Sequence, residues 1–203
     1  MNRNRNPLRR LAVGAVLTAL CALPAHADDT YTLDKLHTQI LFFVDHFGFS
    51  KSQGEFLEFE GQFTLDRNRI ENSTARITIY TESIDMDDDK WNRKMRGKTY
   101  FNSDAHPTIE FESTGVEVLG DDELAVRGNL SMLGSTRPVT LNMRLNKIGV
   151  NLASGMKTAG FSGGTVLHRS DFGMDSHLKY IGDEVEVRLE VEGSVPPFRK
   201  NDS

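Results

Sequence analysis

The chain has 203 residues, with 24 lysines and arginines against 29 aspartates and glutamates, which gives a formal net charge of −5 at neutral pH. Its single cysteine, Cys21, excludes an intramolecular disulfide. An acidic chain is repelled by nucleic acid and by anionic lipid headgroups, so a nucleic-acid partner is not expected.

Residues 1–27 have the features of a cleaved signal peptide. Arginines crowd the first ten residues, an apolar run extends from Leu11 to Leu23, and Ala25-His26-Ala27 gives the small-x-small pattern that signal peptidase cleaves. The apolar run of about 13 residues is shorter than the ~20 that span a bilayer. We therefore expect export from the cytoplasm and a mature chain that starts at Asp28.

Cleavage would leave one domain, residues 28–195, and a short tail, residues 196–203. The leader contains four arginines, no acids and the cysteine, so the mature chain would carry 20 basic against 29 acidic residues, a net charge of −9. Without a cysteine it has no thiolate nucleophile and no cysteine metal ligand. A domain of this size is large enough to bury one core without disulfides.

Apolar residues recur with a period of two along this domain. Within His37–Gly48, Ile40, Phe42 and Val44 share one face, and His46 follows in the same phase. With a short first strand at Tyr31–Lys35, this alternation predicts about eight strands, the later ones at Phe59–Asp66, Arg76–Ser83, Thr108–Ser113, Gly128–Met132, Val139–Leu145, Phe161–Arg169 and Asp183–Val191. Such spacing is typical of an antiparallel sandwich or barrel.

Three segments interrupt the alternation. Residues 47–58, with aromatic residues on both sides of Gly48, are expected to form a turn, and residues 149–160, rich in Gly, Ser and Asn, a loop. From Asp87 to about Gly97 the apolar spacing becomes helical after three consecutive aspartates. Acids in a first helical turn indicate a cap rather than a calcium loop, which would need alternating ligands, a glycine and a final glutamate.

No motif of a nucleophile, a catalytic zinc or a phosphate-binding loop is present in the sequence. Two polar residues fall on the inward phase. His46 is either a hydrogen-bonded histidine at a barrel rim or a base or ligand, and Arg169 either pairs with Asp171 or Asp45 or holds an anionic head group. Trp91 either anchors the helix or lines the mouth of a cavity.

Seven short motifs follow one another in order: HTQILFFVDHFGFS (37–50), Gly61-Gln-Phe63, Ser83-Ile-Asp85, Arg96–Asn102 with Pro107 and Phe111, Gly128–Leu141, Arg169–Met174 and Gly182–Val185. Together they resemble the YceI-like family of periplasmic polyisoprenoid-binding proteins over about residues 31–193. The resemblance implies an all-β, elongated, eight-stranded, antiparallel, lipocalin-like barrel with one interposed helix. The chain departs from the family in the helix, where Trp91-Asn92 and Lys94 replace an Arg-Asp pair and a histidine.

The resemblance further implies a non-enzymatic carrier for an amphiphilic isoprenoid, a polyprenyl lipid or a quinone, without cofactor or metal. Combined with the inward phase, it predicts the ligand-binding residues Phe42, Val44, His46, Phe63, Ile79, Trp91, Phe111, Met132, Met143, Phe161 and Arg169. The same residues could instead fill the barrel. The alternative is then a filled interaction module, associated with envelope stress or the respiratory chain, in which outward Leu41 and Phe43 contact a membrane protein or a second copy.

Overall fold

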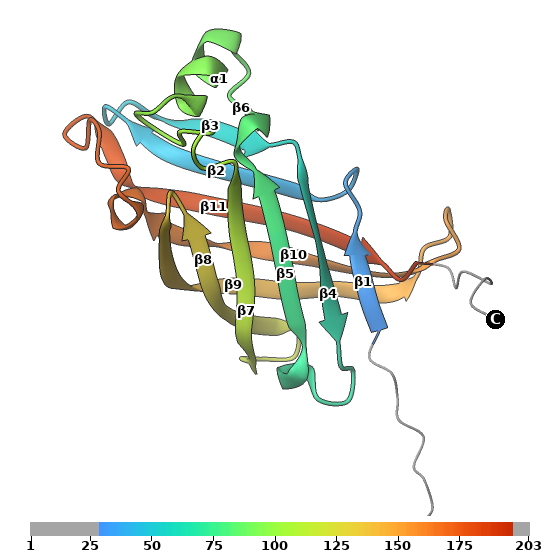
Figure 1. The fold of residues 1–203 in the computed structure, drawn as a ribbon. Coiled ribbons are helices and arrows are strands. Elements are labelled where there is room, and N and C mark those ends of the chain that lie inside the picture. Colours follow the sequence, from blue (N-terminus) through green and yellow to red (C-terminus); the bar gives the residue numbers. More distant parts are fainter. Residues whose placement is uncertain (1–28, 197–203) are drawn as a thin grey trace, which may run out of the picture.

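The structure, a computed structural model, describes residues 29–196; the predicted leader, residues 1–27, and residues 197–203 of the predicted tail lie outside the described residues. One α-helix, α1 (Asp89–Arg96), accompanies eleven antiparallel strands (Figure 1). The strands are β1 (Asp29–Leu33), β2 (Gln39–His46), β3 (Ser50–Phe56), β4 (Phe59–Leu65), β5 (Thr74–Tyr80), β6 (Ile84–Asp85), β7 (Thr108–Val118), β8 (Glu123–Met132), β9 (Ser135–Val150), β10 (Lys157–His168) and β11 (Ile181–Ser194). Within residues 29–196, no helix is long and apolar enough to cross a membrane.

The eleven strands occupy eight positions in one closed barrel, because three positions are each filled by two collinear strands. The first position holds β1 and β2, which both pair with the same edge of β11. The second holds β4, which pairs with β1, and β3, which pairs with β2. The third holds β5, which pairs with β4, and β6, which pairs with β3. The remaining strands follow in chain order up to β11. The predicted eight-stranded antiparallel barrel with one interposed helix is therefore confirmed.

The barrel closes along β11, at the point where its partner strand is interrupted between β1 and β2. Thr38 is buried there, and its hydroxyl donates to the carbonyl oxygen of Glu192 and accepts from the backbone N–H of the same residue, both at 3.1 Å. The Asp34 N–H donates to the Glu192 carbonyl at 2.8 Å. These bonds replace the ladder that is missing between β1 and β2, so the Glu192 backbone groups of β11 stay paired.

Because the strands run alternately up and down, their connections gather at two ends. The helix end carries residues 47–49, 86–107, 133–134 and 169–180, and the far end carries residues 66–73, 119–122 and 151–156. The helix begins as predicted, since the carboxylate of Asp88 accepts from the Trp91 N–H at 2.9 Å.

Asn92 ties this helix to the sheet. Its side chain accepts from the Met86 N–H and donates to the carboxylate of Asp85, each at 2.7 Å. The helix therefore sits over one end of the barrel, where Figure 1 shows it beyond β6.

Two predicted segments were wrong. Residues 47–58 were expected to form a turn, but β3 occupies most of this stretch, because its inward positions Ser52 and Gly54 are too small to give an apolar alternation. Residues 149–160 were expected to be a loop, but β9 and β10 extend into both ends of this segment and leave only residues 151–156 between them. In both places the strands contain small residues of the kind that is typical of a turn or loop.

The Asp34–His37 pair at the strand break should make stability depend on pH. The hydrogen bond between His37 Nδ1 and the Asp34 carboxylate, 2.9 Å long, raises the pKa of His37 above 6.5 and lowers that of Asp34 below 3.8. The stability that His37 contributes is present below pH 6.5 and is lost as the pH rises through its raised pKa. The stability that Asp34 contributes is present above pH 3.8 and is lost as the pH falls through its lowered pKa. Melting temperatures of the wild type, Asp34→Asn, His37→Gln and the double variant should reveal a coupling that is largest between these limits. A coupling that does not change with pH would contradict the assignment.

Candidate functional site

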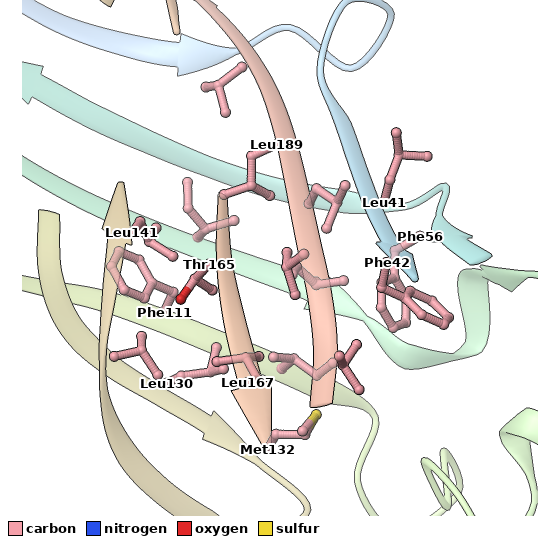
Figure 2. Close-up of a pocket in the computed structure, with 18 of the residues that line it drawn as sticks. Leu41, Phe42, Phe56, Phe111, Leu130, Met132, Leu141, Thr165, Leu167 and Leu189 are labelled. Atoms are coloured by element: carbon pink, nitrogen blue, oxygen red, sulfur yellow. The ribbon is translucent and has the colours of Figure 1, made fainter. Parts of the chain in front are cut away.

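A cavity of about 670 Å³ lies inside the barrel (Figure 2). Its size falls within the range of roughly 300–1,000 Å³ that is typical of small-molecule pockets. All eleven predicted ligand-binding residues belong to its lining: Phe42, Val44, His46, Phe63, Ile79, Trp91, Phe111, Met132, Met143, Phe161 and Arg169. That they contact a ligand remains a prediction.

The interior is hollow rather than filled. Inward residues such as Ile79, Leu141 and Leu189 are only partly buried, although they belong to the interior phase of their strands. Figure 2 shows Phe111, Leu141 and Thr165, from β7, β9 and β10, converging on the same space. In a filled barrel, side chains from facing strands would bury one another, so this geometry disfavours the filled alternative.

Glycines on the inner wall allow large rings to lie against it. A Cβ at Gly54 would come within 2.3 Å of the Phe42 ring, and a Cβ at Gly128 within 2.4 Å of the Phe111 ring. Each ring therefore occupies the space over a neighbouring glycine instead of projecting further into the cavity. Sequence reasoning missed these glycines, although their signal was present as an inward glycine beside a strand that carries an inward phenylalanine.

The charges on the cavity wall are of one sign. Among the described residues that line it, none is an aspartate or a glutamate, whereas Lys94 and Arg169 are cationic and His46 and His177 contribute imidazoles. The Lys94 ammonium lies 4.6 Å from the centroid of the Trp91 ring. The rest of the wall is overwhelmingly apolar, so the cavity suits a long apolar molecule whose polar end is neutral or negative.

The cavity reaches the surface at the helix end. Phe47, Trp91 and Tyr180 belong to the lining, yet their side chains are 51%, 41% and 49% exposed. The rings of Phe47 and Tyr180 stack at 5.4 Å, and the His46 ring meets Phe47 edge-on at 4.8 Å. His46 and Trp91 therefore lie at the mouth of the cavity, which is one of the two positions that the sequence left open for Trp91.

Arg169 is buried, but the predicted ion pair with Asp171 or Asp45 is wrong. Its guanidinium instead donates to four backbone carbonyl oxygens, those of Met174, Ser176, Ile181 and Gly182, at 2.7–3.0 Å. Four of the five N–H groups of an arginine are thus used by carbonyls in the connection between β10 and β11 and in the first two residues of β11. The Asp183 carboxylate accepts from the backbone N–H and the hydroxyl of Ser170. Carbonyl partners leave no signal in a sequence, which is why acids were expected.

Leu41 and Phe43, expected to form an exposed apolar pair, are both partly buried. The Arg188 guanidinium lies 4.6 Å from the centroid of the Phe43 ring and covers it. The surface that motivated the interaction-module alternative is therefore smaller than the sequence suggested.

One group in the described part of the chain brings enough ligand atoms together for a metal ion. Asp34, His37 and Glu192 each offer an atom within 4.8 Å of the others. None of the three lines the cavity. Their place at the strand break, with His37 already bonded to Asp34, fits a structural ion pair.

Replacing Arg169 should destabilise the protein. Arg169→Gln would leave several buried carbonyl oxygens without donors, and we expect the free energy of unfolding to fall by about 3 kcal/mol or more. Urea unfolding measures this change. The exposed Arg144→Gln variant is the control and should stay within about 0.5 kcal/mol of the wild type. An Arg169→Gln variant as stable as this control would contradict the structural role.

Comparison with known proteins agrees with this geometry. A model of the YceI-like domain matches residues 31–193. A UPF0312 protein of Azotobacter vinelandii is 36% identical over 191 residues, which cover 93% of this chain and 97% of that protein, and a UPF0312 protein of Pseudomonas aeruginosa gives the same values.

Solved structures share the fold. Burkholderia cenocepacia BcnA superposes with a TM-score of 0.72 at 22% identity, covering 79% of this chain and 98% of that one. A polyisoprenoid binding domain from Saccharophagus degradans gives a TM-score of 0.65 at 14% identity, covering 82% and 98%. Fold, motif order and family match agree: the chain belongs to the YceI-like family.

Proposed function

We propose that this protein binds a long amphiphilic isoprenoid, a polyprenyl lipid or a quinone, with its chain in the cavity, and carries or sequesters it without catalysis. The observation that supports this most is the apolar cavity of about 670 Å³, open at the helix end and without an acid among its described lining residues. The structural neighbour described as a polyisoprenoid binding domain supports the ligand class.

The energetics of such a ligand are favourable. Burial contributes roughly 0.8 kcal/mol per methylene, so about twenty carbons would supply of order 16 kcal/mol before the costs of ordering chain and protein. Methionines in the lining, Met132 and Met143 among them, adapt to a flexible chain better than branched residues do.

The polar end of the ligand belongs at the mouth in this proposal. His46, His177 and Lys94 lie in the lining at the helix end, where a head group would remain in contact with water. Arg169 contributes less than expected, because one N–H at most remains after its four carbonyl bonds.

The place of action in the proposal is the periplasm. It is supported by the sequence of residues 1–27, with basic residues, an apolar run and a cleavage pattern. A contact with a second copy or with a membrane protein remains the alternative role, and the exposed aromatic residues at the helix end are the surface that favours it.

A tryptophan in the middle of the cavity should block the ligand. Thr165 faces Val187 across the β10–β11 ladder, and both line the cavity, so Thr165→Trp would fill space that is now open. We expect binding of geranylgeraniol, measured by titration calorimetry, to weaken by about ten-fold or more, which corresponds to at least ~1.4 kcal/mol.

The neighbouring outward residue provides the control. Val166 is 55% exposed on the outer face of the same strand, and Val166→Trp should bind geranylgeraniol like the wild type. Equal binding by both variants would place the ligand outside the cavity and contradict the proposal. Circular dichroism would verify that both variants are folded.

A further inference from the structure

Four exposed apolar residues form a rim patch at the helix end: Phe47, Phe49, Leu178 and Tyr180. Phe49 is 91% exposed and Leu178 is 40% exposed. The two segments that carry them lie side by side, since the Phe47 N–H donates to the Tyr180 carbonyl at 2.8 Å and the two rings stack. Figure 1 shows the β2–β3 turn and the connection between β10 and β11 together at one end of the barrel.

The rim patch adjoins the cavity. Phe47 and Tyr180 belong to both the patch and the cavity lining, while Phe49 and Leu178 lie outside the lining. Whatever covers the patch therefore also faces the opening through which a ligand would pass.

The backbone holds these side chains outward. Phe47 has a φ of +57°, a left-handed conformation that is costly for a bulky residue, and Gly48 follows at +71°. The Asp45 carboxylate accepts from the Gly48 N–H at 2.9 Å and fixes the turn. The tip of the hairpin thus presents two exposed rings, those of Phe47 and Phe49.

The charges around the patch differ from those of the chain as a whole. Residues 46–51 and 176–182 contain two lysines, two histidines and no acid, and Asp45, Asp175 and Asp183 flank them. The Lys179 ammonium lies 5.6 Å from the centroid of the Tyr180 ring, and Lys51 pairs with Glu186 at 2.7 Å. Exposed aromatic residues and a leucine flanked by lysines are typical of surfaces that lie in the headgroup region of a membrane.

We propose that the rim patch docks on a phospholipid bilayer, with Phe47, Phe49 and Leu178 among the headgroups and acyl-chain ends. The mouth would then open at the membrane interface, so an isoprenoid chain would pass between bilayer and cavity without crossing water. The acidic remainder of the protein is repelled by anionic headgroups, which favours approach by the two segments, residues 46–51 and 176–182, that carry lysines and histidines and no acid. The transfer step rests on the proposed function, whereas docking itself does not.

Co-sedimentation with extruded vesicles of phosphatidylethanolamine and phosphatidylglycerol tests the proposal. We expect the full-length mature protein to bind, and the double variant Phe49→Ser/Leu178→Ser to bind about ten-fold less or weaker, because two apolar anchors are lost. The matched control is Leu152→Ser. Leu152 is 98% exposed but lies at the far end, so its loss should leave vesicle binding unchanged.

Three outcomes would overturn the proposal. The wild type could stay in the supernatant, or the double variant could bind vesicles as well as the wild type does. Sedimentation velocity could also show a wild-type dimer that the double substitution dissociates, which would make the patch a contact between copies.

The Thr165→Trp variant separates docking from ligand binding. It should bind vesicles like the wild type even though its cavity is filled, and the Phe49→Ser/Leu178→Ser variant should still bind geranylgeraniol in solution. If geranylgeraniol does not bind the wild type but vesicles do, the proposed function fails while docking stands.

Discussion

The structure depends on one constraint, the closure of the sheet along β11. This strand pairs with β10 on one edge and, on the other, with β2 and then β1. The chain leaves the ladder at residues 34–38, between β1 and β2, and the Thr38 hydroxyl bonds there to the Glu192 backbone. Closure leaves no free sheet edge at this seam and encloses the space on which the proposed function depends.

That enclosed space stays open because of how the wall is built. An eight-stranded barrel is just wide enough for its inward side chains to fill it. Here small inward residues alternate with large ones, and rings such as Phe111 lie over glycines such as Gly128. The rings therefore keep their packing contacts with the wall, and the middle of the barrel remains available for a ligand.

The periodicity of the sequence was sufficient for most of the fold. Alternation located most of the strands, and three aspartates located the start of the helix. The inward phase together with the family resemblance identified eleven residues that line the cavity. It failed at β3, because the inward side of that strand carries a serine and a glycine where an apolar alternation was sought. The strand is held by pairing with β2, a long-range contact that the local pattern does not report.

Two features of the site could not be predicted from the sequence, for physical reasons. The partners of Arg169 are backbone carbonyls, and every residue has one, so nothing in the chain distinguishes the four that are used. Whether the interior is hollow depends on the directions of rings such as Phe42 and on strand register. The alternation of apolar and polar residues along a strand does not report either, because it is the same in a filled and in an open barrel.

The most direct test of the central claim is the mass of the protein purified from its own cells, measured by native mass spectrometry and again after organic extraction. We predict an excess mass of one isoprenoid per chain that disappears on extraction and returns when the extracted protein is soaked with the recovered lipid. A native mass equal to that of the polypeptide, unchanged after soaking with polyprenyl lipids and quinones, would contradict the account.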